Sequence, residues 1–497
     1  MKILDNERDA ANQTFERFGQ SVDALIAGGQ LEQAVVGHDI CVEGPFGSHR
    51  LVYADHAASG RALKQVEEFI ITNVLPYYAN PHSRASFCGR RINALRGEAR
   101  RRVAQACGAD DRYDVIFAGA GATAGIQKLV HLFELSGRSD FRSENPPLII
   151  VGPYEHHSNL LPWRESGAET IELPESEACS GPCPQALERI LQEAGSRKVV
   201  CSFSAGSNVT GSLVDIEAIT RLAKGYGALV VWDNAGAGPY LPIAMAPSSD
   251  ASIDAVVVSP HKMLGGPGAT GVLIVRREAV AIDRPTASGG GTVRYVTAAD
   301  HDYSLDLATR EEAGTPNTIG DIRAALAFEV KEALSRAGCS AIGRTFASKA
   351  RSQWSAHANL HMLGPCSGDR LPIIAFRMTG KHGQLVHHQL ITQLLSDRYG
   401  IQTRGGCACA GPYVHRLLSI DDDGAQSLRR AVLAGDEMAK PGFVRLSFSS
   451  CMSEETASYI IEAVSEVAKH IDELAALYRH DENEAIFEYC GETCAVA

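Results

Sequence analysis

The sequence lacks several features that would place it in other classes of protein. Among its 497 residues, no charge-free apolar run approaches the roughly 18 residues that a membrane-spanning helix needs. Acidic residues outnumber basic ones by 59 to 47, which argues against binding to nucleic acid or to an anionic membrane. Residues 1–18 carry several charges and have no apolar core of a secretory signal. We therefore expect a cytoplasmic protein of enzyme size.

Paired cysteine spacing is also lacking. The 13 cysteines form an odd number and are scattered along the chain, which suits free thiols in a reducing compartment better than a disulfide scaffold. No His/Cys cluster has the spacing of zinc ligands and no Walker A lysine motif is present, so no metal is expected. The apolar fraction of 45% is ordinary for a folded protein with a substantial core.

Short apolar runs alternate with segments of helical period. Strands are predicted at residues 148–151, 199–203, 229–232, 255–258, 271–275, 373–376 and 444–448, and helices at 7–27, 216–226, 325–337 and 454–480. Such interleaving predicts an α/β fold with a mostly parallel central sheet flanked by helices.

A stretch rich in Gly, Thr and Pro at residues 286–317 indicates a domain boundary just after it. We expect a large domain at 51–320 and a smaller α+β domain at 321–497. An N-terminal arm at 1–50 is expected to join the small domain.

A lysine follows one of the predicted buried strands. Ser259-Pro260-His261-Lys262 comes directly after residues 255–258 and precedes a glycine-rich turn. A desolvated lysine amine loses its proton readily and can form a Schiff base with an aldehyde cofactor. On these residues alone, a surface lysine in a glycine-rich hairpin is an equally good interpretation.

Two other strand ends carry matching chemistry. The strand at 229–232 ends at Asp233, and pyridoxal phosphate needs an acid beside its ring nitrogen. If Asp233 stood alone, a helix N-cap would be the better interpretation. Residues 117–126 predict a strand, a glycine turn and a helix, which offer backbone N–H groups to a phosphate. The same turn matches a dinucleotide fingerprint, but residues 131–145 are too polar for the second strand that NAD binding requires.

Together these motifs resemble the class V aminotransferase family of fold-type I pyridoxal-phosphate enzymes, and within it the cysteine desulfurases. The resemblance extends from Tyr53-Ala-Asp-His-Ala-Ala-Ser-Gly60 to the C-terminal helix. It implies pyridoxal 5′-phosphate as cofactor, joined to Lys262 and paired through its ring nitrogen with Asp233. His156 would stack on the ring and relay protons. The phosphate-binding residues that it implies are Ala122, Thr123, Ser259 and His261.

The resemblance also implies a homodimer with shared active sites and an amino-acid substrate. Thr315, in Glu312-Ala-Gly-Thr-Pro-Asn317, would reach the phosphate of the partner subunit. Asn208 would lie near the cofactor's phenolic oxygen and the substrate carboxylate. Arg445 would clamp that carboxylate bidentately, and Arg404 is placed with it among the substrate-binding residues.

The nucleophile separates a desulfurase from its relatives. Residues 403–412 resemble the desulfurase cysteine loop, in which Cys409, five residues after Arg404, would be catalytic. The implied reaction converts L-cysteine to L-alanine and leaves a persulfide on Cys409, with Lys262 as the base. Selenocysteine lyase activity is a close variant. Two buried thiols, or a redox pair, are the alternatives for Cys407 and Cys409.

Two features depart from the desulfurase pattern. Gly236 occupies the position of a glutamine that hydrogen-bonds the cofactor, a role that Tyr240 or His157 would have to fill. An insert at 417–440, which contains an acidic run, lies between Cys409 and the substrate arginine. The insert and the Cys-x-Cys pair look more like the aminotransferase-like domain of molybdenum-cofactor sulfurases.

Other functions remain open on the sequence. Another class V reaction that does not use Cys409, such as that of a transaminase, an epimerase or a carbon–sulfur lyase, is the first alternative. A non-catalytic protein on the same fold is the second. We expect any sulfur acceptor to be a separate protein or small molecule. The pair Cys490 and Cys494 is interpreted as incidental, with sulfur transfer or a disulfide as its alternatives.

Overall fold

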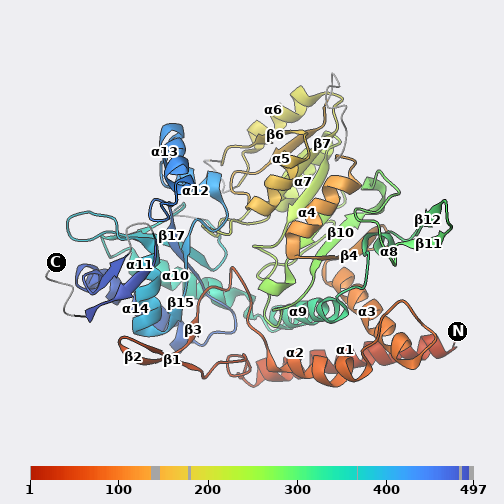
Figure 1. Cartoon of the computed structure of the whole chain (residues 1–497), viewed down its shortest axis with the longest axis horizontal. Helices are drawn as coiled ribbons and strands as arrows, with labels where there is room; N and C mark the ends of the chain where they lie inside the picture. Colours follow the sequence, from red (N-terminus) through yellow and green to blue (C-terminus); the bar gives the residue numbers. More distant parts are fainter. Residues whose placement is uncertain (1, 136–145, 177–180, 366–367, 481–483, 492–497) are drawn as a thin grey trace. The chain divides into compact units, whose positions relative to one another are not determined.

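The computed structural model describes residues 2–135, 146–176, 181–365, 368–480 and 484–491, in two compact units (Figure 1). Unit 1 contains Met1–Gln30, Ser59–Gly206 and Leu213–Gly338. Unit 2 contains Leu31–Ala58, Ser207–Ser212 and Cys339–Ala497. Across the helices of this described part of the chain, none is long and apolar enough to cross a membrane.

Unit 1 is built on a central sheet that, in the described residues, has seven strands in the order β4-β10-β9-β8-β7-β5-β6. The strands are β4 (Tyr113–Gly119), β5 (Leu148–Val151), β6 (Glu169–Glu172), β7 (Val199–Ser204), β8 (Leu229–Asp233), β9 (Ala255–Val258) and β10 (Gly271–Arg276). Strands β9, β8, β7, β5 and β6 pair in parallel, whereas β10 is antiparallel to both β4 and β9. Every residue of β5, β7 and β9 is buried, as expected for a sheet covered on both faces.

Helices and one exposed hairpin complete unit 1. The helices are α1 (Lys2–Ala27), α2 (Lys64–Phe69), α3 (Phe87–Ala106), α4 (Gly121–Leu132), α5 (Leu161–Glu165), α6 (Pro184–Ala194), α7 (Ile216–Gly225), α8 (Leu307–Glu311) and α9 (Thr318–Arg336), and the hairpin joins β11 (Val293–Val296) to β12 (His301–Tyr303). Helix α4 packs against β4, β9 and β10, which places its N-terminus beside the ends of these strands.

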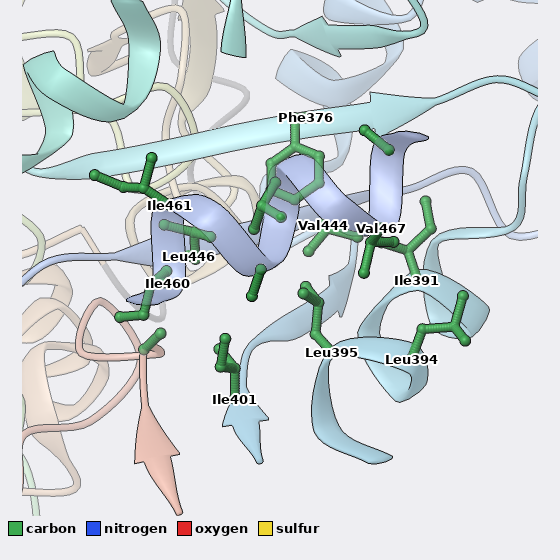
Figure 2. Packing of buried hydrophobic residues seen from close by; sticks show 14 of the residues in the cluster. Phe376, Ile391, Leu394, Leu395, Ile401, Val444, Leu446, Ile460, Ile461 and Val467 are labelled. Carbon is green, nitrogen blue, oxygen red and sulfur yellow. The ribbon is translucent and has the colours of Figure 1, made fainter. Parts of the chain in front are cut away.

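Unit 2 has its own antiparallel sheet, which in the described residues has the order β13-β14-β17-β16. Its elements are β1 (Cys41–Gly44), β2 (Gly47–Arg50), β3 (Val52–Tyr53), α10 (Ile342–Trp354), β13 (Leu360–Met362), β14 (Ile373–Met378), α11 (His388–Tyr399), β15 (Ile401–Gln402), β16 (Arg404–Gly406), α12 (Gly411–Leu417), α13 (Asp422–Leu433), β17 (Phe443–Ser447), α14 (Glu454–Lys469), α15 (Ile471–Ala475), β18 (Tyr478–His480) and β19 (Phe487–Tyr489). Phe376, Leu446 and Ile391 pack with Val467 of α14 in the core of this unit (Figure 2).

The predicted α/β class with a mostly parallel sheet is confirmed, and each predicted strand is present to within about two residues. The long helix predicted at 454–480 is divided into α14 and α15, and the prediction is wrong after Ala475. Ser453 caps α14 by accepting a hydrogen bond from the Thr456 N–H, as its position predicted. The helix ends at Lys469, and residues 478–480 form a strand because they pair with β19.

The two units differ from the expected domains in where two helices lie. Helix α1 packs on α3 and α9 within unit 1. The ring of Phe15 on α1 also lies 5.3 Å from the ring of Phe69 on α2. Helix α9 also belongs to unit 1, so the division follows Gly338 rather than residue 320. Apolar periodicity marks the buried face of a helix but does not say which surface that face meets.

The core of unit 2 gives a direct test of its packing. Ile391 is fully buried, so Ile391→Ala removes buried methyl groups and leaves a cavity. We expect the free energy of unfolding to fall by about 2–5 kcal/mol, measured by urea denaturation. The control is Leu433→Ala on α13, where the side chain is 76% exposed and a change within about 0.5 kcal/mol is expected. Equal effects of the two substitutions would contradict this packing.

Candidate active site

Lys262 lies in a short 3₁₀ turn that follows β9 directly. Two glycines make close backbone approaches around this turn. A Cβ atom on Gly60 would lie 1.8 Å from the Met263 carbonyl oxygen, and one on Gly266 would lie 1.9 Å from that of Pro260. Both distances exclude any side chain. The main chain that carries Lys262 is therefore packed tightly within unit 1.

Asp233 is the last residue of β8, the strand next to β9. It is 4% exposed, and the Ala235 N–H donates a hydrogen bond of 2.8 Å to its Oδ1. Burial raises the pKa of this carboxyl, against the opposing effects of that hydrogen bond and of the positive charge of Lys262. A buried acid and an amine thus come from the ends of two adjacent parallel strands, where ligands of such sheets bind.

The N-terminus of α4 contacts the lysine-bearing segment. The Ala122 N–H donates to Ser259 Oγ at 3.0 Å. A Cβ atom on Gly121 would lie 3.0 Å from Cε1 of His261, so these two residues are also close together. Helix α4 has no side-chain cap at its N-terminus. Backbone N–H groups and hydroxyls of this kind are the donors that a phosphate takes.

His156 is connected to the same helix end. Its Nδ1 accepts a hydrogen bond of 3.1 Å from the Ser158 N–H, and Ser158 Oγ lies 2.7 Å from Thr123 Oγ1. Because Nδ1 is an acceptor, the neutral ring carries its proton on Nε2. The imidazole is therefore held in one tautomer next to the first turn of α4.

Glu155 is a residue to which sequence reasoning gave no role. It is 5% exposed, and its carboxylate accepts hydrogen bonds from the backbone N–H and the hydroxyl of Ser204, at 2.8 and 2.6 Å, and from Asn159 Nδ2 at 2.6 Å. Burial, with a smaller contribution from the charge of Asp233, raises its pKa to about 7, although these hydrogen bonds oppose the rise. A carboxylate next to His156 and four residues after the buried strand β5 was the available signal.

Unit 1 thus brings together most of the sequence-predicted cofactor residues: Ala122, Thr123, His156, Asp233, Ser259, His261 and Lys262. Thr315 has different surroundings. It is exposed, and its Oγ1 lies 3.5 Å from Asn80 Nδ2. The loop that carries it is anchored by Glu312, which accepts hydrogen bonds from Arg100. Gly236, Tyr240 and His157 all belong to unit 1.

Unit 2 contains the predicted substrate arginines. Arg404 and Arg445 face each other across the paired strands β16 and β17. Asp55 accepts from both, at 2.9 Å from Arg404 Nε and 2.8 Å from Arg445 Nη2. Without this acid, two cations would oppose each other directly, which destabilises a sheet. The three groups together carry one net positive charge.

The two arginines differ in exposure. The side chain of Arg404 is 50% exposed and that of Arg445 only 4%. Burial lowers the pKa of Arg404, but the hydrogen bond and charge of Asp55, with smaller contributions from Tyr53 and Cys409, raise it overall. Arg445 Nη1 donates to the Asn208 carbonyl at 3.0 Å, while its buried Nε has no hydrogen-bond partner in the described structure.

The cysteine loop follows β16. Ala408 and Cys409 both have left-handed backbone conformations, with φ of 50° and 54°. Asn208 Nδ2 donates to the Ala408 carbonyl at 2.8 Å. Cys409 is exposed and Cys407 is half-buried. Among the free cysteines of the described residues, Cys409 shares its exposure with Cys41 alone.

Two other sequence features can now be placed. The acidic run of the 417–440 insert begins α13, where Asp421 caps the helix by accepting from the Gly424 N–H at 2.8 Å. No side chain of α13 is buried, so the insert is a surface excursion. Cys490 is disulfide-bonded, and Cys494 lies outside the described residues.

The donor set of unit 1 fits pyridoxal phosphate. An amine is present for the aldehyde, a buried acid for the ring nitrogen, and a helix N-terminus with neighbouring hydroxyls for the phosphate. Gly121 has no side chain where His261 and Ser259 approach the helix. These features together define a site of the fold-type I pyridoxal-phosphate class.

Comparisons with known proteins agree with that class. The family model for aminotransferase class-V matches residues 52–459, so the chain belongs to this family of pyridoxal-phosphate-dependent enzymes. A cysteine desulfurase of Pectobacterium atrosepticum is 28% identical over 388 residues, which cover 77% of this chain and 88% of the relative. A probable cysteine desulfurase of Streptomyces coelicolor is 27% identical over 73% of this chain and 84% of its own length.

Solved structures show the same fold. The apo structure of a cysteine desulfurase from Thermococcus onnurineus has a TM-score of 0.69 at 22% identity, and the match covers 84% of this chain and 95% of that one. A cysteine desulfurase from Escherichia coli has a TM-score of 0.65 at 24% identity, over 84% of this chain and 94% of that one. The central mixed sheet flanked by helices is thus common to these proteins.

The buried carboxyl of Glu155 predicts a pH dependence of stability. Its pKa of about 7 in the folded chain exceeds the ordinary 4.5, so the stabilisation from its bound proton is complete below about pH 4.5 and is lost as the pH rises through 7. Glu155→Gln has no proton to lose. The stability of wild type relative to Glu155→Gln should therefore fall by at least about 1 kcal/mol between about pH 5 and pH 8, in denaturant titrations. A constant or rising difference would contradict this ionisation.

Proposed function

We propose that this chain is a pyridoxal-phosphate-dependent cysteine desulfurase, active as a homodimer, that converts L-cysteine to L-alanine and leaves a persulfide on Cys409. The observation that carries the proposal is the exposed Cys409 thiol on a left-handed turn, in the same unit as two arginines that share one carboxylate. Non-glycine residues in this conformation persist where the surroundings enforce them, and they cluster at functional sites.

In this proposal, unit 1 binds the cofactor. Lys262 would hold the cofactor through its aldehyde group, Asp233 would keep a proton on its ring nitrogen, and His156 would pack against its ring. The hydroxyls of Thr123 and Ser259 and the first turn of α4 bind the phosphate, with His261 beside them. Bound pyridoxal phosphate supplies the electron withdrawal that makes the Cα–H bond of the substrate acidic and its sulfur electrophilic.

Unit 1 residues also move protons. Lys262 Nζ takes the proton from the substrate Cα. The neutral ring of His156 carries its proton on Nε2, because Nδ1 accepts from the Ser158 N–H. The raised pKa of Asp233, which burial causes, favours keeping a proton between its carboxylate and a ring nitrogen.

Unit 2 binds the substrate carboxylate. The single net positive charge of Arg404, Arg445 and Asp55 matches one carboxylate. The buried Nε of Arg445 has no acceptor in the described structure, and an unsatisfied buried donor costs about 1–3 kcal/mol. A carboxylate that accepts from this guanidinium relieves the cost. An amino acid with one carboxylate and a neutral side chain, such as cysteine, fits this balance of charge.

Cys409 performs the sulfur transfer. Its thiolate attacks the sulfur of the substrate, so that an S–S bond forms and the C–S bond of the substrate breaks. The electron pair of the broken bond goes to the substrate Cβ, which takes a proton and leaves as alanine. One cysteine and the enzyme thiol thus become one alanine and the enzyme persulfide.

The homodimer in this proposal is inferred from Thr315. Its side chain is exposed, and Glu312 anchors its loop through Arg100. In the proposal, Thr315 binds the phosphate held by the partner subunit. The persulfide is then delivered to a separate acceptor, which can be a protein or a small molecule.

The first experiment measures alanine released from L-cysteine by the cofactor-loaded protein. We expect wild type and Cys407→Ser to form alanine, whereas Cys409→Ser should lose at least about 100-fold in rate, since the hydroxyl is a far weaker nucleophile at neutral pH. Alanine formation by Cys409→Ser at the wild-type rate would favour a carbon–sulfur lyase route. Absence of alanine with wild type would favour another class V reaction.

The cofactor role of Lys262 has a separate test. Protein reconstituted with pyridoxal phosphate and then desalted should show visible absorbance that persists, because the cofactor is covalently held. Lys262→Ala should lose this band and the bound cofactor should leave on dialysis. The matched control is Lys198→Ala. Lys198 directly precedes β7, and its amine donates to the Phe133 carbonyl. Equal retention in both variants would refute the assignment of Lys262.

A further inference from the structure

A short segment of the chain leaves unit 1 and returns to it. Residues on both sides of Ser207–Ser212 belong to unit 1, whereas these six residues belong to unit 2. The Leu371 N–H donates to the Gly211 carbonyl at 2.8 Å, and Ser212 forms an isolated β-bridge with Arg370. Backbone contacts therefore attach the segment Ser207–Ser212 to unit 2.

The segment Ser207–Ser212 contacts the cysteine loop and the start of α12. Near the middle of the loop, Asn208 Nδ2 donates to the Ala408 carbonyl at 2.8 Å. At the end, where α12 begins, Thr210 Oγ1 lies 3.2 Å from the Tyr413 hydroxyl. Thr210 and Tyr413 are each 1% exposed, so this hydrogen bond is shielded from water. Two polar side chains of one six-residue segment thus contact residues that precede and follow Cys409 in the sequence.

The loop needs such support. Ala408 and Cys409 are consecutive residues with positive φ, a conformation that side chains with a Cβ rarely adopt. Within the loop itself, the Ala410 N–H donates to the Cys407 carbonyl at 3.2 Å. The amide of Asn208 holds the carbonyl of the first left-handed residue and therefore fixes the turn that exposes the next side chain.

We propose that Ser207–Ser212 is a clamp that presents the Cys409 thiol, with Asn208 and Thr210 as positioning residues. The clamp gives the loop one conformation, in which Cys409 is exposed and Cys407 is half-buried. The same segment accepts a hydrogen bond from Arg445 at the Asn208 carbonyl, so the buried arginine and the thiol are positioned through one residue. The role of this arrangement in catalysis rests on the proposed desulfurase function. The contacts between the clamp and the cysteine loop do not depend on that function.

The test compares how fast the two cysteines react with iodoacetamide in the native, cofactor-loaded protein. Fragment ions of the peptide that follows Arg404 resolve Cys407 from Cys409. In wild type we expect Cys409 to react faster, because it is the exposed thiol. In Asn208→Ala and Thr210→Val the loop is released, Cys407 becomes accessible, and the Cys409 to Cys407 rate ratio should fall by about threefold or more.

Three controls make the readout specific to the clamp. Thr210→Ser keeps the hydroxyl and should restore the wild-type ratio. Tyr413→Phe removes its partner and should reproduce the effect of Thr210→Val. Ser465→Ala removes a buried hydrogen bond to the Ile461 carbonyl in α14, away from the loop, and should leave the ratio unchanged. Because Thr210→Val changes one buried group by an atom or two, it keeps the proposal testable if Asn208→Ala does not fold.

Hydrogen exchange gives a second readout. Backbone amides of residues 405–411 should exchange roughly fivefold faster in Asn208→Ala and Thr210→Val, while those of β14 stay as in wild type. The proposal is overturned if neither variant changes the rate ratio, or if Ser465→Ala changes it equally. Alanine formation by wild type is measured separately, so failure of the desulfurase function and failure of the clamp give different results.

Discussion

One buried carboxylate is the constraint on which unit 2 depends. Asp55 joins two arginines that the strand register places directly opposite each other, and removing it would leave two cations facing one another next to the cysteine loop. Its Oδ1 accepts from Nη2 of Arg445 and its Oδ2 from Nε of Arg404, while Nη1 of Arg445 donates to the Asn208 carbonyl. Asn208 in turn holds the Ala408 carbonyl. A chain of hydrogen bonds therefore connects the acid to the residue before Cys409.

Unit 1 also contains buried acids that hydrogen bonds hold in place. Glu155 and Asp233 are buried acids whose charges interact, and each is kept in place by donors from neighbouring backbone. Glycine at position 60 lets the chain pass against the turn that carries Lys262, at a distance no side chain allows. The sheet and the end of α4 position the amine and the acids, and groups that are held in place in this way lower the cost of binding and catalysis.

Much of the fold and of the candidate site could be predicted from the sequence, because strands and the residues at their ends have local sequence patterns. Apolar runs located the strands, and Asp233 and Lys262 follow two of them directly, so their proximity follows from parallel pairing. Tertiary partners left no such signal. Asp55 lies 349 residues from Arg404 in sequence, and the motif that contains it does not indicate this ion pair. The helix at 454–480 failed at its end because pairing of Tyr478 with Tyr489 overrides helical periodicity.

The most direct test of the account is to find where the sulfur goes. Cofactor-loaded protein is mixed with one equivalent of L-cysteine, trapped with an alkylating reagent under non-reducing conditions, and mapped by peptide mass spectrometry. The account predicts one extra sulfur atom on Cys409 and none on Cys407 or on Cys41, the other exposed free thiol of the described chain. Alanine formed without sulfur on Cys409, or with sulfur on another cysteine in Cys409→Ser, would contradict it.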